Sequence, residues 1–386
     1  MAQIHGTCDA KFEGVRAKFQ EFVASGFEVG ASLTVTIDGQ DAVNIWGGYA
    51  DAGRTRPWNE DTIVNVFSTT KTICALAVLL LINEGKLSAN DRVAKHWPEF
   101  AASGKEDVEI RHLLSHTSGL AVFEDPITMA EMCDVELVTS RLEKQRPRWT
   151  PGTASGYHAW TYGYPIQEVV RRVTGLGIRK FVAARIAGPL GADFQIGARE
   201  EDWRRVSDVI PPPPFELPDP ATMPPADSLP AKMLNPIPDA GFANSSTWRR
   251  AEVASANGHT NAKGLATIWS NALTISDESK RLLSKETIDI IFQEQSYGPD
   301  LVYGAIVRFG TGLSIRGNGD AIIDSWIPKG RLCYWGGWGG STVINDIDRN
   351  ITICYAMNKM ESGTVGNTAF RAYVAEIYKA LGVSIP

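Results

Sequence analysis

The stretch Val66–Ile82, VFSTTKTICALAVLLLI, carries a serine at the start of the most apolar segment of this chain. No charge occurs from Ile73 to Ile82, and small residues alternate with bulky ones, which predicts a helix buried on all sides. A segment of this length is too short to cross a bilayer. If the helix begins near Thr69, Ser68 lies at its N-terminus, where unpaired backbone N–H groups favour an oxyanion.

Lys71 follows Ser68 by three residues, so one helical turn places both side chains on the same face. A lysine amine surrounded by apolar residues has a lowered pKa and can take the proton of the serine hydroxyl. No other serine in the chain has a lysine at the third position after it. On this motif alone, a helix-capping serine beside a surface lysine is an equal alternative.

Composition excludes several classes of protein. Of the 386 residues, 44% are hydrophobic, which is enough for one large domain or two modest ones. The net charge is −6 and no long Lys/Arg run occurs, so nucleic acid and anionic membranes are not expected as partners. A small neutral ligand is favoured.

The N-terminal sequence and the spacing of the cysteines both favour an intracellular protein. The first residues, MAQIHGTCDAKFEG, include no apolar core of the kind that a secretory signal needs, so we expect a cytoplasmic location. The cysteines are odd in number and widely spaced without a Cys-x-x-Cys pair, which favours free, mostly buried thiols over disulfides or a zinc site.

Strand patterns occur near both ends of the chain and helical patterns between them. Residues 31–37 and 42–48 flank a hairpin turn at Asp38-Gly39-Gln40. Further strands are predicted at 304–309, 312–315, 331–335, 342–345 and 351–356, and helices at 10–25, 109–120, 166–173, 263–273, 286–292 and 369–381. We therefore expect an α/β (α+β) fold: a sheet domain of residues 1–72 and 295–386 with a mostly helical insertion of residues 73–294.

Residues 210–238 are rich in proline, with Pro211–Pro214 consecutive. No helix or central strand is expected there. A disordered linker is the simpler interpretation, but the segment also contains apolar residues such as Phe215, Leu229 and Met233. We favour an ordered wrap over the helical region that rims the active site.

Three motifs stand out together: Ser68-Thr69-Thr70-Lys71, Gly156-Tyr157-His158-Ala159 and the run from Trp335 to Ser341, WGGWGGS. In this order and context the chain resembles the serine β-lactamase and penicillin-binding-protein superfamily, and most closely its family VIII carboxylesterases. The resemblance extends over most of the chain and implies the fold of class C β-lactamases, an antiparallel sheet with flanking helices.

The resemblance implies that Ser68 is the acylated nucleophile, that Lys71 is its partner and that Tyr157 is the tyrosine of the second motif. Either Lys71 or Tyr157 is the resting base, and the sequence leaves this choice open. His158 is a further, weaker candidate, although adjacent residues usually point apart. The backbone N–H groups of Ser68 and Trp338 are the expected oxyanion hole.

Where β-lactamases carry Lys-Thr-Gly, this chain carries Trp335-Gly336-Gly337, and Ala159 stands where they often carry asparagine. Both departures remove groups that would hold a lactam substrate and its carboxylate. Trp335, Gly336, Gly337, Trp338, Trp160 and His158 are the expected substrate-binding residues. Their aromatic character favours a neutral, apolar ester.

The expected activity is hydrolysis of short-chain carboxylic esters, with no cofactor and no metal. His112 and His116 are four residues apart, but no third ligand accompanies them, so a packed helix end is favoured over a metal site. A β-lactamase or D-Ala-D-Ala peptidase, an acyltransferase and a catalytically inactive binding protein are the alternatives. A homo-oligomer is compatible with the sequence.

Overall fold

The computed structural model describes residues 3–213 and 224–386. Within them, nine strands form one sheet in which every neighbouring pair is antiparallel. Its strand order is β1 (Ile4–Cys8), β3 (Gln40–Gly48), β2 (Gly30–Ile37), β13 (Ile351–Met357), β12 (Thr342–Asp346), β11 (Leu332–Gly336), β10 (Ser314–Ile315), β9 (Ile306–Phe309) and β8 (Ser296–Pro299). The pairing of β2 with β13 joins the two ends of the chain, as the sequence predicts.

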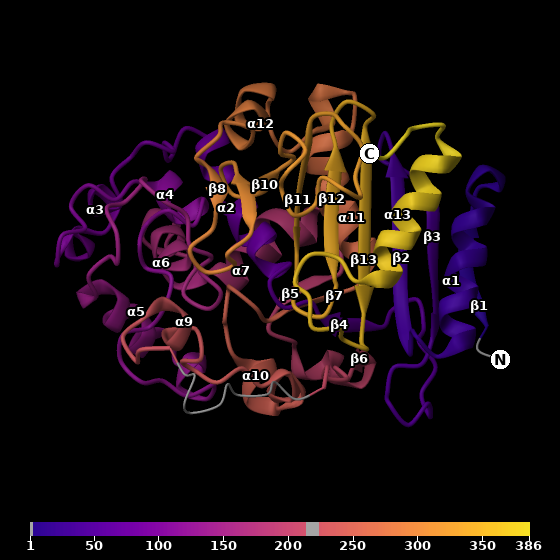
Figure 1. Cartoon of the computed structure of the whole chain (residues 1–386), viewed down its shortest axis with the longest axis horizontal. Helices are drawn as coiled ribbons and strands as arrows, with labels where there is room; N and C mark the ends of the chain where they lie inside the picture. The colour runs from indigo at the N-terminus through magenta and orange to yellow at the C-terminus, as the bar shows by residue number, and fades with distance from the viewer. Residues whose placement is uncertain (1–2, 214–223) are drawn as a thin grey trace.

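Helices cover both faces of this sheet. Neighbouring residues of a strand point to opposite faces. Tyr355 of β13 stacks on Phe370 of α13 (Thr368–Ala380), which lies beside α1 (Glu13–Ser25) in Figure 1. Ser32 of β2, which pairs with the residue after Tyr355, accepts a hydrogen bond from the N–H of Ala262, the first residue of α11 (Ala262–Trp269). The sheet is therefore enclosed between α1 and α13 on one side and α11 on the other.

The remaining helices lie on both sides of β8 in Figure 1. They are α2 (Thr70–Asn83), α3 (Val93–His96), α4 (Ile110–Leu114), α5 (Val135–Lys144), α6 (Gly163–Thr174), α7 (Ile178–Val182), α8 (Gly188–Leu190), α9 (Leu229–Lys232), α10 (Ser246–Arg250) and α12 (Lys285–Ile291). Every residue of α2 from Thr70 to Leu81 is buried, which confirms the prediction of a helix without a solvent face. Among the described residues, no helix combines the length and hydropathy needed to span a membrane.

Local signals explain most element boundaries. The hairpin between β2 and β3 turns at Asp38 and Gly39, whose φ angles are 51° and 75°. Two positive φ angles are typical of a type I′ turn, which matches the right-handed twist of paired strands. Gly26 ends α1 in the left-handed conformation at φ 74°. The domain boundaries at residues 72–73 and 294–295 stay a prediction. The helix α11 belongs to the predicted insertion by sequence, but it packs on strands β2 and β13 of the sheet.

The structure differs from the sequence prediction in several places; for example, the edge strands β1 and β8 and the helix α5 were not predicted. The helix expected at 109–120 ends at Leu114, because His116 has a φ of 61° that a helix cannot contain. The Pro-rich segment contains the one-turn helix α9, since Pro230 occupies its first turn, where no N–H is needed. Its residues 214–223 lie outside the described part. A four-stranded sheet was not predicted: β5 (Phe194–Ile196), β7 (Gly258–Thr260), β4 (Ile63–Asn65) and β6 (Val206–Ser207) are too short to show periodicity.

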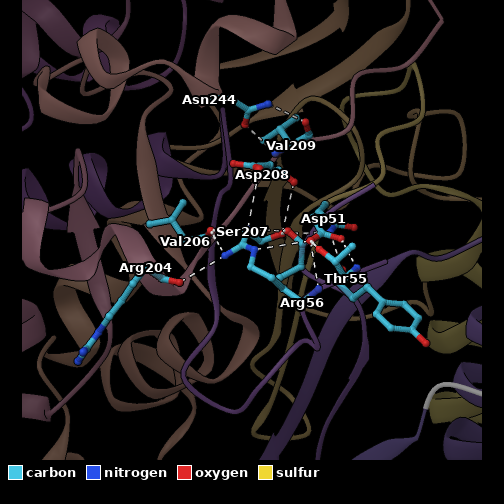
Figure 2. A network of polar contacts seen from close by, with 12 residues as sticks. Asp51, Thr55, Arg56, Arg204, Val206, Ser207, Asp208, Val209 and Asn244 are labelled. Carbon is cyan, nitrogen blue, oxygen red and sulfur yellow. Dashed lines mark hydrogen bonds and ion pairs between the residues drawn. The ribbon is translucent and has the colours of Figure 1, made fainter. Parts of the chain in front are cut away.

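The chain that leaves β6 toward the Pro-rich segment is tied to the loop between β3 and β4 (Figure 2). The Arg56 guanidinium donates to the carbonyls of Arg204 and Val206 at 3.3 to 3.4 Å, and Ser207 Oγ donates to Ala50 O at 2.9 Å. The Asn244 side chain then pairs with both backbone groups of Val209 at 2.8 and 2.9 Å. These contacts fix residues 204–209 on the body of the protein.

Candidate active site

Ser68 lies on a tight turn between β4 and α2. Phe67 has a φ of 42°, a conformation that non-glycine residues rarely adopt and that often marks a functional site. Thr69 N donates to Val66 O at 3.1 Å and Thr70 N donates to Phe67 O at 2.9 Å, so the turn is closed around Ser68. The serine is 9% exposed at the start of the helix, as the sequence predicts.

Lys71 is buried and lies against the serine. Its Nζ is 2.9 Å from Ser68 Oγ, 2.7 Å from Ala159 O and 2.8 Å from Ser255 O. Burial holds the pKa of Lys71 well below its usual range. A neutral amine fits these partners, because it has two N–H donors for the two carbonyls and one lone pair for the serine hydroxyl.

The Tyr157 phenol completes the group around the serine. Lys71 Nζ lies 5.1 Å from the centre of its ring, and Trp335 Nε1 donates to its Oη at 3.4 Å. Burial raises the pKa of Tyr157 to about 12, although the Ser68 and Trp335 side chains act in the opposite direction. The structure thus brings Ser68, Lys71 and Tyr157 together, and the phenol carries its proton at neutral pH.

Asp300 holds Tyr157 in place. Its buried Oδ1 accepts the backbone N–H of Tyr157 at 3.0 Å and those of Val302 and Tyr303 at 2.9 and 3.0 Å. The Tyr303 ring stacks on the Tyr157 ring with centres 4.7 Å apart and planes at 19°. Sequence analysis missed Asp300, because a lone aspartate in a turn between two strands carries no motif.

Two backbone N–H groups near the serine, those of Ser68 and Trp338, lack an acceptor in the described part of the chain. Gly337 brings the two segments together: a Cβ on it would lie 3.1 Å from Thr69 N and only 2.1 Å from Val66 O. A side chain at position 337 would therefore push the Trp338 turn away from the serine turn.

Ser341 clamps these two turns. Its Oγ donates to Val66 O at 2.9 Å and lies 2.9 Å from Thr69 Oγ1, while its carbonyl accepts the N–H of Gly337 at 2.7 Å. Thr69 Oγ1 also donates to Ser341 O at 3.1 Å. Both side chains are buried, and their hydrogen bonds hold the turn of Ser68 against the turn of Trp338.

A cavity of about 230 Å³ opens above Ser68 and Tyr157. Apolar and aromatic side chains dominate its wall, and Lys232 is the one charged residue among them. Its lining comprises Phe67, Ser68, Ala121, Val122, Phe123, Tyr157, Ala159, Trp160, Thr161, Lys232, Met233, Asn235, Pro238, Ala256, Trp338, Ser362 and Thr364. Trp160 and Trp338 were expected here; the other expected substrate-binding residues lie behind this wall.

Trp335, Gly336, Gly337 and His158 do not line the cavity. Trp335 packs against Tyr157 with ring centres 5.1 Å apart and supports the phenol from behind. His158 is turned away, with Nε2 2.8 Å from Ser118 Oγ and Nδ1 2.6 Å from Gly156 O. Burial lowers the pKa of His158 to about 3, which does not suit a general base.

The histidine pair at 112 and 116 has structural partners. His112 Nδ1 accepts the N–H of Glu109 at the start of α4, and His116 Nδ1 accepts the N–H of His158 at 3.1 Å. No group of three or more potential metal ligands occurs among residues 3–213 and 224–386. The two rings help to build the α4 cap and the aromatic packing around Tyr157.

Several known proteins resemble this chain in sequence. Residues 15–376 match the Beta-lactamase family. The Esterase/beta-lactamase LipL of Mycobacterium tuberculosis is 31% identical over 212 residues, covering 54% of this chain and 49% of the relative. Esterase EstB of Burkholderia gladioli is 34% identical over 184 residues, covering 42% of this chain and 45% of the relative. The matched stretch thus spans about half the length of these relatives.

Likeness to a solved structure extends over the whole chain. The crystal structure of a family VIII carboxylesterase superposes with a TM-score of 0.89 at 35% identity, covering 98% of this chain and all of the other. Together with the match over residues 15–376, this shows that the chain belongs to the beta-lactamase family, in its branch of family VIII carboxylesterases.

Proposed function

We propose that this protein is a serine carboxylesterase that hydrolyses short-chain carboxylic esters through an acyl-enzyme on Ser68. The observation that carries the proposal is the position of Lys71 Nζ, held by two carbonyls within 2.9 Å of Ser68 Oγ. The apolar cavity above the serine supports a neutral ester as substrate.

In the proposed acylation step, Ser68 Oγ attacks the ester carbonyl carbon and its proton passes to Lys71 Nζ. Negative charge develops on the carbonyl oxygen, which the N–H groups of Ser68 and Trp338 receive. The bond to the alcohol oxygen then breaks, and the alkoxide leaves with the phenolic proton of Tyr157. The Lys71 ammonium returns a proton to Tyr157, so both groups are restored.

In deacylation, water attacks the acyl carbon and Lys71 takes its proton. The Lys71 ammonium then gives this proton to Ser68 Oγ as the bond between Oγ and the acyl carbon breaks. Ser68 leaves as the hydroxyl, Lys71 is neutral again, and the carboxylic acid is released. The lowered pKa of Lys71 and the raised pKa of Tyr157 support the amine as the resting base and the phenol as the proton donor.

Hydrolysis of β-lactams is not favoured. Position 159 presents a methyl group to the cavity, and no cationic side chain stands at position 335 to bind a lactam carboxylate. Transfer of the acyl group to an alcohol instead of water uses the same acyl-enzyme, and product analysis with added alcohol distinguishes the two. The cytoplasmic location and a homo-oligomeric state stay predictions, which cell fractionation and light scattering test.

Acylation of the purified protein is the direct test. We expect turnover of p-nitrophenyl butyrate, slower turnover of a chromogenic cephalosporin, and a fluorophosphonate adduct that mass spectrometry locates on Ser68. Ser68→Ala should remove both turnover and adduct. Ser384→Ala, a change at an exposed serine outside the cavity, is the matched control and should retain both. Butyrate hydrolysis by Ser68→Ala at the wild-type rate would refute the proposal.

A further inference from the structure

The described end of the Pro-rich segment, residues 224–238, forms one wall of the cavity, and we name it the strap. Its residues Lys232, Met233, Asn235 and Pro238 line the cavity. Ala121, Val122 and Phe123 form another wall and belong to the loop of residues 121–127 that runs between Gly119 and the Met132 turn. The width of the cavity therefore depends on how the strap is attached to this loop.

Asn235 makes that attachment. Its Nδ2 donates to Phe123 O at 3.2 Å and to Asp125 O at 2.8 Å, while its Oδ1 accepts the N–H of Ile127 at 2.9 Å. One carboxamide thus satisfies three backbone groups of the facing loop, as the backbone of a neighbouring strand would do in a sheet. No apolar residue of similar size could replace it without leaving those groups unpaired.

A cluster of charges reinforces the same joint. Arg148 binds the Glu124 carboxylate with two N–H groups at 2.5 and 2.6 Å, and reaches Asp227 of the strap at 3.0 Å. Lys232 of the strap donates to Glu124 O. The pKa of Glu124 is lowered, mainly by its hydrogen bond with Arg148, so the carboxylate is ionised over the whole neutral range. The strap and the loop are therefore bound together by opposite charges as well as by Asn235.

The other side of the Pro-rich segment is also anchored. Residues 204–209, which precede it, are fixed by the Arg56 contacts shown in Figure 2. The strap itself is held on the loop by the Asn235, Arg148 and Lys232 contacts, so a movement of the strap away from this loop would break them. The cavity of about 230 Å³ lies below the usual range of about 300–1,000 Å³ for ligand pockets.

We propose that Asn235 is a specificity-determining residue: it holds the strap against residues 121–127 and thereby restricts the substrate to esters with short chains. This inference rests on the proposed esterase function. Release of the strap should enlarge the cavity and admit longer apolar chains. Short chains should then be bound less well, because fewer atoms of the wall contact them.

The test is the ratio of kcat/KM for p-nitrophenyl octanoate to that for p-nitrophenyl butyrate. In Asn235→Ala this ratio should rise at least about tenfold over wild type, since each methylene that fits or fails to fit a pocket is worth about tenfold or more. Arg148→Gln, which changes a residue outside the cavity lining, should raise the same ratio by a smaller factor. Asn90→Ala, at an exposed asparagine outside the lining, is the matched control and should leave the ratio unchanged.

A ratio that stays at the wild-type value in Asn235→Ala, with both rates intact or uniformly reduced, would overturn the inference. If Asn235→Ala fails to fold, Arg148→Gln decides by the same ratio. A wild-type protein that hydrolyses no ester would instead overturn the proposed function. The two failures are therefore distinguished by the wild-type measurement.

Discussion

The substitution Gly337→Ala tests whether the spacing of the Ser68 and Trp338 N–H groups supports catalysis. A Cβ at position 337 would lie 2.1 Å from Val66 O and 2.5 Å from Ser341 Oγ. An ordinary contact begins at 3.4 Å, so the two turns must separate by about 1.3 Å to accept one methyl group. The φ angle of Gly337 lies outside the left-handed region, and the effect is therefore one of space and not of backbone strain.

A displacement of this size should remove one donor from the proposed oxyanion hole. Loss of one such donor typically lowers kcat by about 10²–10³, and a misplacement of about 1 Å costs about 10². We expect kcat for p-nitrophenyl butyrate to fall by about 10²-fold. KM should change much less, because the two N–H groups act on charge that develops only in the transition state.

The assay is steady-state hydrolysis by purified variants whose fold is checked by circular dichroism. Gly53→Ala is the matched control: its added Cβ would meet nothing closer than 3.6 Å, and Gly53 is exposed and outside the cavity. A folded Gly337→Ala variant with kcat within about threefold of wild type would refute the reasoning, since a lost donor cannot be so mild.

Two further predictions concern buried ionisable groups. Lys71→Met should lower kcat by about 10²–10⁴-fold, because the proton acceptor is lost. Lys105→Met is the control: this buried lysine donates to three carbonyls, so its loss should lower the thermal midpoint but keep the activity of the folded protein. Equal loss of kcat in both variants would contradict the role of Lys71. Burial raises the pKa of Glu28 to about 8, so the folded state holds a proton that the unfolded state has lost between pH 4.5 and about 8. Wild-type stability should therefore fall as pH rises through this window, and Glu28→Gln, beside Tyr355, should flatten the dependence in pH-resolved thermal melts; an unchanged slope would show that other groups cause it.

Elements with a repeating local signal were predictable from sequence. The alternation at 31–37 and 42–48, the turn at Asp38-Gly39 and the apolar run after Ser68 each report backbone structure directly, because neighbouring residues determine it. The helix predicted at 109–120 was too long, since the packing of His116 among aromatic rings overrides the apolar periodicity. The strands β4 to β7 are too short to show a periodic pattern in the sequence.

Ser68 and Lys71 could be proposed from the sequence because of their spacing at the start of a helix, and Tyr157 because of the resemblance to family VIII carboxylesterases. Their surroundings could not. The acceptors that support a neutral Lys71 are the backbone carbonyls of residues 159 and 255, which side-chain identity does not reveal. Asp300, Ser341 and Asn235 act on backbone groups 143, 275 and 108 residues away, so only the folded chain brings them to the site. Sequence alone determined which groups are candidates for the reaction. Tertiary structure decided their burial, their spacing and the cavity beside them, because desolvation and distance exist only in the packed protein.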